Sequence, residues 1–259
     1  MVKFQKMKSR RTILCAVSKS PCTMHYQPII DGRTKHAVAF EAFFRGFKGG
    51  SEGNSGEALF ASSAAKEDLW EFDIACFASA LRHGRDLARN HLLFINIHEA
   101  TIRRLAENIY VILLFMKAIG IDPGSIVLEI AEESAISDVA YLGEDIRMLK
   151  ALGFRIAFDR VTSTSNWIEC LPELSPAFLK LAPANVTDIA HRKEGRSFVD
   201  RICRLSEERG MNLIAVGVET EEGEKTLKDL GVPFMQGYLF GHPQHAAAWR
   251  VPALGEVSS

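Results

Sequence analysis

Short apolar runs of strand length recur along the chain, and stretches with helical spacing of apolar residues separate them. Most of these runs consist of Ile, Val, Leu and Phe, which is typical of strands buried on both faces of a parallel sheet. The eight strand candidates are residues 23–30, 36–43, 92–97, 126–130, 155–159, 177–181, 213–217 and 233–238. Asp31-Gly32 joins the first two and predicts an antiparallel hairpin before the parallel units begin.

Helical stretches fill most of the gaps between these strands. They are residues 57–68, 70–88, 100–119, 138–152, 197–209 and 221–230. Gly120, Gly153, Gly210 and Gly231 each follow such a stretch, where a glycine can adopt the left-handed conformation that ends a helix. In a chain of 259 residues this alternation predicts one α/β domain, a TIM-like (β/α)8 barrel modified by an antiparallel first strand.

The barrel is expected to span residues 23–245, with no room for a second domain. Residues 1–22 form a basic lead-in before it, and residues 246–259 form a C-terminal tail. The apolar run inside the lead-in, residues 12–17, is too short for a signal-peptide core or a membrane span. The lead-in is therefore either a solubilising segment or a small basic arm for a partner or a membrane surface. Residues 46–56 are rich in glycine and are expected to form a surface loop.

Charge and cysteine usage narrow the functional classes. The 31 Lys and Arg residues nearly balance the 32 Asp and Glu residues, which predicts no general affinity for nucleic acid or for an acidic membrane. The five cysteines form an odd set without a CxxC pair, so neither a disulfide framework nor a zinc site is indicated. We expect a cytoplasmic protein.

Polar side chains interrupt the apolar runs at or near the carboxyl ends of most strands. They are Glu41, Asn96, Glu129, Asp159, Lys180, Glu219 and Gln236. In an α/β barrel these strand ends meet at one mouth, so the side chains are expected to converge. Carboxylate and amide oxygens are the ligands that Mg²⁺, Mn²⁺ and Ca²⁺ prefer. The alternative is a set of helix caps and internal ion pairs in a barrel without a working site.

Longer motifs around these positions resemble the EAL domain, the cyclic di-GMP phosphodiesterase family of bacteria. The motifs are Tyr26-Gln27-Pro28, Glu41-Ala42-Phe43-Phe44-Arg45, Asn96, Glu129-Ile130-Ala131-Glu132, Asp159, Leu179-Lys180, Gly217-Val218-Glu219-Thr220 and Gln236-Gly237-Tyr238-Leu239-Phe240. Each motif is weak alone, but the ordered set, from about Tyr26 to Pro243, is specific. The resemblance identifies residues 23–245 as an EAL-type barrel domain.

The resemblance implies a site in which two divalent ions, Mg²⁺ or Mn²⁺, share a water molecule and activate it for hydrolysis of a phosphodiester. The metal ligands that it implies are Glu41, Asn96, Glu129 and Asp159. It implies that Lys180 orients the water or the phosphate. The nucleotide-binding residues that it implies are Gln27, Glu41, Arg45, Asp159, Gln236 and Pro243.

Two positions depart from the acidic pattern of the family. Arg160 follows Asp159 where the family has a second aspartate, and Val216 stands where the family has the first glutamate of Ala-Glu-Gly-Val-Glu. A guanidinium ~4 Å from a divalent ion would be repelled by ~8 kcal/mol at an effective dielectric constant near ~20. If Arg160 points into the site, we expect the second metal ion to be lost.

The charge that remains is too small to hold two dications. Glu41, Glu129 and Asp159 carry three negative charges, and Lys180 and Arg160 carry two positive charges. We therefore expect at best one weak site for Mg²⁺ or Mn²⁺, with no metal as the simpler outcome. No intact catalytic set is expected.

Lys180 and Glu219 would then be remnants of a catalytic set, and the chain a catalytically degenerate EAL-type protein. The main hypothesis is a regulator that acts through protein–protein contact in cyclic di-GMP-linked control of motility, biofilm formation or transcription. One alternative is a cyclic di-GMP receptor without hydrolysis, in which Arg160 meets a nucleotide phosphate. Another is a slow metal-dependent phosphodiesterase in which Glu219 substitutes for Val216. A protein partner is expected, with no nucleic acid and no membrane span, and either a monomer or a homodimer.

Overall fold

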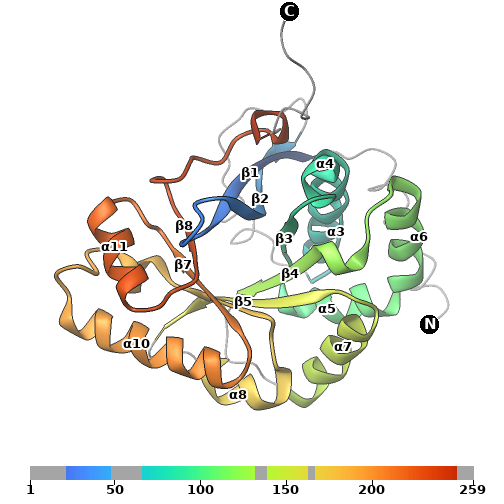
Figure 1. The fold of residues 1–259 in the computed structure, drawn as a ribbon. Helices are drawn as coiled ribbons and strands as arrows, with labels where there is room; N and C mark the ends of the chain where they lie inside the picture. The colour runs from blue at the N-terminus through green and yellow to red at the C-terminus, as the bar shows by residue number, and fades with distance from the viewer. Residues whose placement is uncertain (1–21, 48–65, 132–138, 163–166, 250–259) are drawn as a thin grey trace, which may run out of the picture.

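Eight strands close into a barrel in which each strand neighbours the next one in chain order (Figure 1). This computed structural model describes residues 22–47, 66–131, 139–162 and 167–249. The strands are β1 (Cys22–Asp31), β2 (Ala37–Phe47), β3 (Leu92–Asn96), β4 (Ile126–Ala131), β5 (Arg155–Val161), β6 (Phe178–Leu181), β7 (Asn212–Val216) and β8 (Phe234–Gln236). All eight predicted strands are confirmed, and their ends differ from the predicted ones by four residues at most.

The first strand is antiparallel to both of its neighbours, and the Asp31-Gly32 turn predicted its antiparallel pairing with β2. Its register with β2 pairs Gln27 with Glu41, and its register with β8 consists of Ile30 with Met235 and Asp31 with Phe234. The remaining neighbours are parallel. The structure therefore confirms a TIM-like barrel with an antiparallel first strand.

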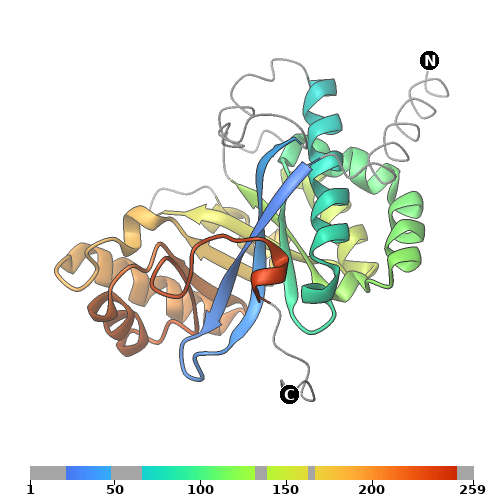
Figure 2. The ribbon, with the colours of Figure 1, turned by 90° about the horizontal axis from the view of Figure 1, so that it is seen from above.

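Helices cover the outside of the barrel, as the two perpendicular views show (Figures 1 and 2). The α-helices are α3 (Lys66–His83), α4 (Arg85–Ala88), α5 (Glu99–Glu107), α6 (Ile109–Ile119), α7 (Val139–Ala151), α8 (Trp167–Leu174), α9 (Pro183–Val186), α10 (Lys193–Glu208) and α11 (Glu221–Asp229). Two 3-10 turns, η1 (Pro123–Ser125) and η2 (Ala246–Trp249), accompany them. The four glycines predicted to end helices all have positive φ angles, which confirms that prediction. None of the helices in the described segments is long and apolar enough to cross a membrane.

Two predicted helices are each broken into two. The helix expected at 70–88 is interrupted at Gly84, where the Tyr26 ring packs so closely that a Cβ would lie 2.7 Å from it and where the Tyr26 hydroxyl donates a hydrogen bond to Ala80 O. The helix expected at 100–119 breaks at Asn108, whose side-chain Nδ2 donates to Arg104 O at 2.8 Å and so ends α5. Both breaks depend on side-chain contacts that periodicity does not encode.

Two short helices, α8 and α9, were not predicted. The first contains Pro172 and the second is a single turn that begins at Pro183, so neither has a long apolar period. The helix expected at 57–68 and the loop expected at 46–56 lie almost entirely outside the described residues.

The first residues of the expected tail, which begins at residue 246, are described by the structure. Residues Ala246–Trp249 form η2, and Trp249 Nε1 donates a hydrogen bond to Tyr26 O at 2.7 Å. The Trp249 ring also lies 5.9 Å from the ring of Phe40. A large aromatic side chain with a satisfied N–H group buries apolar surface against the barrel.

The interior of the barrel holds a layer of apolar side chains, while a larger apolar core lies between the strands and the helices. The interior layer consists of Ile29, Ala39, Phe94, Val127, Ala157, Phe178 and Ile214. Because strand side chains alternate between two faces, residues two positions away on each strand also point inward. The same alternation therefore determines which side chains form the next inward-facing layer, toward the carboxyl ends of the parallel strands.

Candidate functional site

A ring of inward-facing side chains lies at the mouth of the barrel, one layer above the apolar interior. Each member stands two positions along its strand from an apolar interior residue, as Glu41 does from Ala39 and Lys180 does from Phe178. The members of this mouth ring are Gln27, Glu41, Asn96, Glu129, Asp159, Lys180, Val216 and Gln236. The structure thus brings together all but one of the polar strand-end residues that the sequence singled out.

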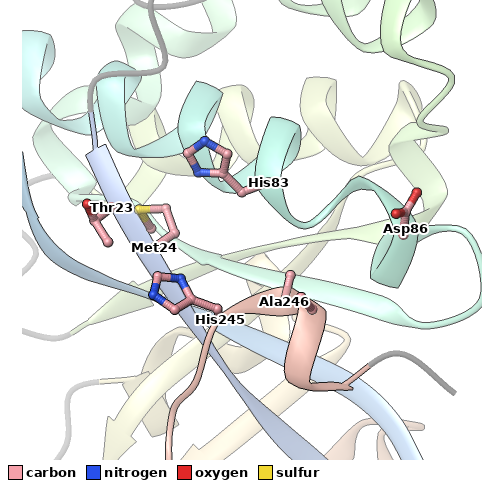
Figure 3. A pocket seen from close by; sticks show the side chains of 7 residues that line it. Thr23, Met24, His83, Asp86, His245 and Ala246 are labelled. Atoms are coloured by element: carbon pink, nitrogen blue, oxygen red, sulfur yellow. The ribbon is translucent and has the colours of Figure 1, made fainter. Parts of the chain in front are cut away.

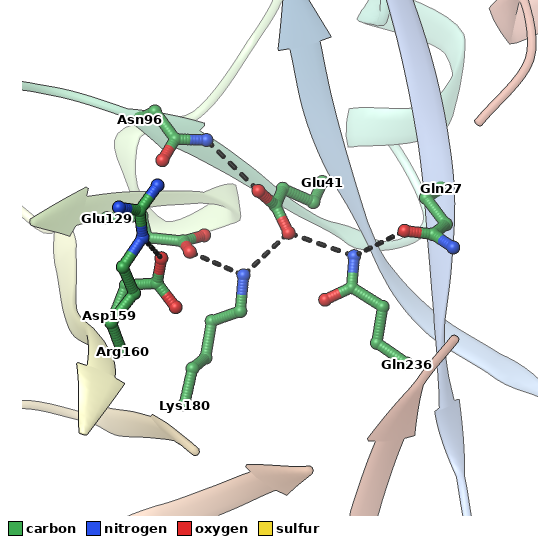
Figure 4. A network of polar contacts seen from close by, with 8 residues as sticks. All are labelled: Gln27, Glu41, Asn96, Glu129, Asp159, Arg160, Lys180 and Gln236. Carbon is green, nitrogen blue, oxygen red and sulfur yellow. Dashed lines mark hydrogen bonds and ion pairs between the residues drawn. The ribbon is translucent and has the colours of Figure 1, made fainter. Parts of the chain in front are cut away.

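Lys180 occupies the centre of the mouth ring (Figure 4). Its Nζ lies 2.6 Å from Glu41 Oε2 and also contacts Glu129 Oε1. The three side chains are almost fully buried, with exposed fractions of 2%, 5% and 0% for Lys180, Glu41 and Glu129. Removing any one of these three buried charges would leave the others without compensation. The three side chains therefore form one interdependent ion pair network at the mouth.

Burial and charge act on the ionisable groups of the ring in opposite directions. Burial lowers the pKa of Lys180, but the charges of Glu129 and Glu41 outweigh this effect and leave that pKa raised. Burial, followed by the charge of Glu41, raises the pKa of Glu129 well above its usual range. Burial also raises the pKa of Asp159, although the Lys180 charge partly offsets it. Lys180 therefore stays protonated, and Glu129 takes up a proton more readily than a free carboxylate.

Three amide side chains complete the network around Glu41. Gln236 Nε2 donates to Glu41 Oε2 at 2.9 Å and to Gln27 Oε1 at 3.2 Å. Asn96 Nδ2 donates to Glu41 Oε1 at 3.0 Å. Gln27 Nε2 in turn donates to the backbone carbonyl of Gly241 at 2.9 Å, a contact that no sequence motif signalled. Glu41 thus accepts hydrogen bonds at both of its carboxylate oxygens.

Arg160 points toward the acidic cluster rather than away from it (Figure 4). Its Nε lies 3.8 Å from Asp159 Oδ2, and 48% of its side chain is exposed. Its φ angle is +57°, in the left-handed region, and the register of β5 with β6 shifts between Phe158 and Val161. Strand alternation alone would turn a residue after the inward-facing Asp159 to the outer face of the sheet. The irregular backbone keeps Arg160 at the mouth instead.

Val216 is the apolar member of the mouth ring. It pairs with Gln236 across β7 and β8 and packs against the apolar interior layer. Glu219, three residues later, is exposed after the end of β7 and lies outside the network around Lys180. The mouth therefore has no carboxylate on this strand.

Two residues expected to meet a nucleotide lie outside the network of Figure 4. Arg45 is four positions beyond Glu41 on β2, where its Nη1 donates to Phe44 O at 3.1 Å and its guanidinium lies 5.3 Å from the Phe43 ring. Pro243 is half-buried in the segment after β8, next to Gln244, which bridges to Tyr26. Glu132, part of a motif, lies outside the described residues.

The mouth ring contains buried oxygen atoms of the kind that bind a divalent cation. Glu129 Oε2 and Gln236 Oε1 are buried oxygens without a hydrogen-bond partner in the described part of the chain, so each has a vacant coordination position. As they stand, no three acidic, histidine or cysteine side chains among the described residues are grouped to hold a metal ion, because Lys180 separates Glu41 from Glu129. A cation between Glu41 and Glu129 would require Lys180 to move.

A separate pocket lies outside the barrel mouth, beside the first half of β1 (Figure 3). Its volume is about 330 Å³, and its lining includes Thr23, Met24, His83, Asp86 and His245. None of its lining residues belongs to the mouth ring. The pocket therefore contributes nothing to the acidic cluster.

Comparison with known proteins places these observations in a family context. Residues 10–243 match the family model described as EAL domain. The probable cyclic di-GMP phosphodiesterase PdeA of Escherichia coli is 34% identical over 52% of this chain and 19% of its own length. The blue light- and temperature-regulated antirepressor BluF of Escherichia coli is 23% identical over 83% of this chain and 52% of its own length. This chain thus spans about half or less of these two curated relatives.

A solved structure also resembles this chain. It is Klebsiella pneumoniae BlrP1 in a manganese and cyclic di-GMP complex, with a TM-score of 0.78 and 26% identity. The match covers 87% of this chain and 57% of the BlrP1 chain. The barrel observed here therefore has the same fold as the matched part of that protein.

Proposed function

Because this chain belongs to the EAL domain family, we propose that it is a catalytically degenerate member that regulates through protein–protein contact in cyclic di-GMP-linked signalling. The observation that carries the proposal is the ion pair between Arg160 and Asp159, with Nε and Oδ2 3.8 Å apart. It puts a fixed positive charge beside a carboxylate that the family resemblance assigns to a metal ion. Motility, biofilm formation and transcription are the processes in which such a regulator would act.

The charge of the mouth supports loss of the two-metal reaction. Three carboxylates face two cations, so the cluster has a net charge of one negative unit before any metal ion binds. Two dications would add four positive charges next to Lys180 and Arg160. At an effective dielectric constant near ~20, each close contact between a cationic side chain and a dication costs ~8 kcal/mol. One weak Mg²⁺ or Mn²⁺ site, held by Glu41, Asn96, Glu129 and Asp159, is the most that the donor set supports.

A relative supports regulation by contact with another protein. BluF of Escherichia coli is named an antirepressor, and its matched region covers 83% of this chain. An antirepressor acts on a repressor, which is a protein partner. We extend this mode of action to the present chain and propose a transcriptional or motility regulator as the partner.

A turnover assay tests the loss of catalysis. Purified chain incubated with cyclic di-GMP and either Mg²⁺ or Mn²⁺ should produce no linear dinucleotide above the level of buffer alone. The double variant Arg160→Asp and Val216→Glu restores two carboxylates to the mouth and should produce it measurably. Metal-dependent turnover by the unmodified chain would instead identify a slow phosphodiesterase, and an inactive double variant would refute the assigned cause of inactivity.

Affinity capture tests the protein partner. The immobilised chain is exposed to extract of the native cell, and captured proteins are quantified against an immobilised EAL domain that retains the full acidic set. The expected result is the same regulator enriched in every replicate, followed by reconstitution of the complex from two purified proteins. If capture yields no protein that reconstitutes, regulation by protein contact is wrong.

A cyclic di-GMP receptor without hydrolysis is the second candidate function. Gln236 Nε2 donates hydrogen bonds to Glu41 Oε2 at 2.9 Å and to Gln27 Oε1 at 3.2 Å. These contacts hold three polar side chains side by side at the mouth, which favours binding of a polar ligand. BlrP1, which is 26% identical, has a structure with cyclic di-GMP and manganese. Calorimetric titration with cyclic di-GMP decides this candidate, and no heat at micromolar protein would exclude it.

A further inference from the structure

The first half of β1 has one edge that no described strand covers. On its other edge, β1 pairs with β2 along almost its whole length. On this edge, β8 pairs only with the last two residues of β1, and one isolated bridge joins Tyr26 to Gln244. Within the described segments, no strand therefore pairs with the part of β1 before Tyr26 on this side.

The backbone groups of Met24 point toward this edge. In an antiparallel pair, successive residues direct their N–H and C=O groups alternately toward the partner strand and away from it. Tyr26 directs its groups away from β2, because its N–H donates to Gln244 O at 2.6 Å and its C=O accepts from Gln244 N at 3.0 Å. The N–H of Cys22 also points away from β2, since it donates to Ser79 Oγ at 3.2 Å.

Met24 lies midway between Cys22 and Tyr26, so its N–H and C=O groups face the same way as theirs. The nearby register shift adds its extra residue to β2, which keeps the alternation along β1 intact. No hydrogen bond between described residues reaches the Met24 backbone on this side. The edge thus presents a backbone donor and acceptor to an incoming chain.

The pocket outside the barrel mouth lies beside this edge and offers a place for a side chain (Figure 3). Its volume is about 330 Å³, and its lining consists of Thr23, Met24, His83, Asp86, His245, Ala246 and Ala247. Consecutive strand residues direct their side chains to opposite faces, so lining by both Thr23 and Met24 places the pocket against the strand edge. The methionine and the two alanines make part of the lining apolar, which favours burial of an apolar side chain there.

The rim of the pocket has a surplus of positive charge. Arg85, Asp86 and Arg89 follow one another in and directly after α4. Both arginines are exposed, and Asp86 pairs with Arg89 at 3.6 Å, so one carboxylate stands against two guanidinium groups. An acidic side chain on an incoming segment is attracted to such a rim, which speeds association and selects the partner.

Backbone groups, an apolar pocket and a basic rim together match an extended peptide. A peptide that adds as a strand to a sheet edge gains main-chain hydrogen bonds, and pockets for its alternate side chains give specificity. A helix would gain nothing from the Met24 backbone, because its own N–H and C=O groups are already paired. The bridge between Tyr26 and Gln244 shows that this edge accepts antiparallel pairing next to Met24.

We propose that an extended, acidic segment of a protein partner docks on this edge, pairs with the backbone of Met24 and places an apolar side chain in the pocket. The inference rests on the proposed function, regulation by protein contact, and adds to it the surface and the conformation of the bound segment. None of the pocket-lining residues belongs to the mouth ring, so this docking edge is separate from the acidic cluster.

The test uses a phage-displayed library of random short peptides, selected on the immobilised full chain. Enriched peptides are synthesised and titrated by fluorescence polarisation. Ala247→Trp fills the pocket and should weaken binding by about tenfold or more, whereas Ala248→Trp should change it by less than about twofold. The two variants are matched, because both alanines are exposed in η2 and only Ala247 lines the pocket.

N-methylation of single peptide amides tests strand addition directly. Only alternate N–H groups of an added strand pair with β1, so methylation should weaken binding at every second position and not at those between. If no enriched peptide is weakened by Ala247→Trp, or if methylation shows no alternation, docking by strand addition is wrong. Equal melting temperatures of the two tryptophan variants verify that both are folded.

The partner obtained by affinity capture is titrated against the same two variants. Weaker binding by Ala247→Trp alone supports the docking edge, whereas equal binding by both overturns it while regulation by protein contact stands. If no partner reconstitutes, the proposed function fails, and the peptide titrations still decide whether the edge binds an extended segment. Sedimentation that shows a dimer of the unmodified chain and a monomer of Ala247→Trp would assign the edge to a second copy and overturn the partner.

Discussion

The ammonium of Lys180 lies 2.6 Å from Glu41 Oε2, although the two residues are 139 positions apart in the sequence. The same ammonium contacts Glu129, so one cation joins three strands across the barrel mouth. Neither carboxylate is exposed by more than 5%. Removing the cation would leave buried charge without a partner, and this makes Lys180 the most informative residue to change.

Lys180→Met should lower the free energy of unfolding by ~3–5 kcal/mol, because it removes one partner of a buried ion pair. Urea unfolding at neutral pH measures the loss. Lys117→Met changes an exposed lysine on α6 and should alter stability by less than ~0.5 kcal/mol. Equal effects of the two substitutions would show that the Lys180 contacts contribute nothing to stability.

Lys180→Met, which should lower stability, should raise the affinity of the mouth for a divalent cation. Lys180→Met leaves Glu41, Glu129 and Asp159 without the central ammonium, so a divalent cation can take its place. Millimolar Mn²⁺ should therefore raise the melting temperature of the variant by more than it raises that of the unmodified chain. Differential scanning fluorimetry with and without EDTA measures both shifts. Identical shifts would contradict the competition between Lys180 and a metal ion.

Glu129→Gln should make stability depend less on pH. The native pKa of Glu129 is raised, chiefly by burial and then by Glu41, so the folded chain binds this proton more tightly than the unfolded chain does. Its contribution is then fully present below about pH 4.3 and is lost as pH rises through the raised native pKa. Lys180 has a raised pKa and stays charged across this window.

The measurement is urea unfolding from about pH 4.5 to about pH 8. The stability of the unmodified chain should decline across this range more steeply than that of Glu129→Gln. Asp159, whose pKa is also raised, acts in the same direction in both proteins and leaves a residual slope. Parallel pH profiles would show that the Glu129 carboxyl is not perturbed by its surroundings.

Arg160→Gly should raise the free energy of unfolding by ~0.5–1 kcal/mol. A glycine adopts a φ angle of +57° without the steric cost that arginine meets there, and the half-exposed ion pair with Asp159 contributes little. Arg155→Gly, in the extended part of the same strand, should lower stability by ~0.5–1 kcal/mol. Thermal and urea unfolding measure both. A loss of stability in Arg160→Gly would mean that the arginine contacts outweigh the backbone strain.

Gly237→Ala should lower stability by ~3 kcal/mol or more, because a Cβ at that position would lie 2.0 Å from Val218 O. The close approach lets Gly217 N and Val218 N donate to Gln236 O, which positions Gln236 in the mouth ring. Gly231→Ala is the matched comparison, since its Cβ would meet no atom within 4 Å and only its φ angle of +84° is unfavourable. It should cost ~1 kcal/mol. Soluble, equally stable variants would refute the backbone clash.

Most of the architecture could be predicted from local sequence patterns. The helix predictions that were wrong also have local causes. The apolar runs located every strand, and the Asp31-Gly32 turn predicted the antiparallel pairing that the register of β1 with β2 confirms. Periodicity did not predict the interruptions at Gly84, against which the Tyr26 ring packs, and at Asn108, whose side chain donates a hydrogen bond to Arg104 O. Periodicity also did not predict α8, a short helix that contains Pro172.

The sequence by itself determined that most of the polar strand-end side chains face the mouth, because alternation along a strand sets the direction of each residue relative to its neighbours. It also determined that Arg160 and Val216 stand where the resemblance to the family implies acids. Only the tertiary structure decided which residues become partners, since Glu41, Glu129 and Lys180 meet through closure of the barrel. It also decided that Arg160 turns inward, because a positive φ angle and a shifted register break the alternation that would have turned it outward.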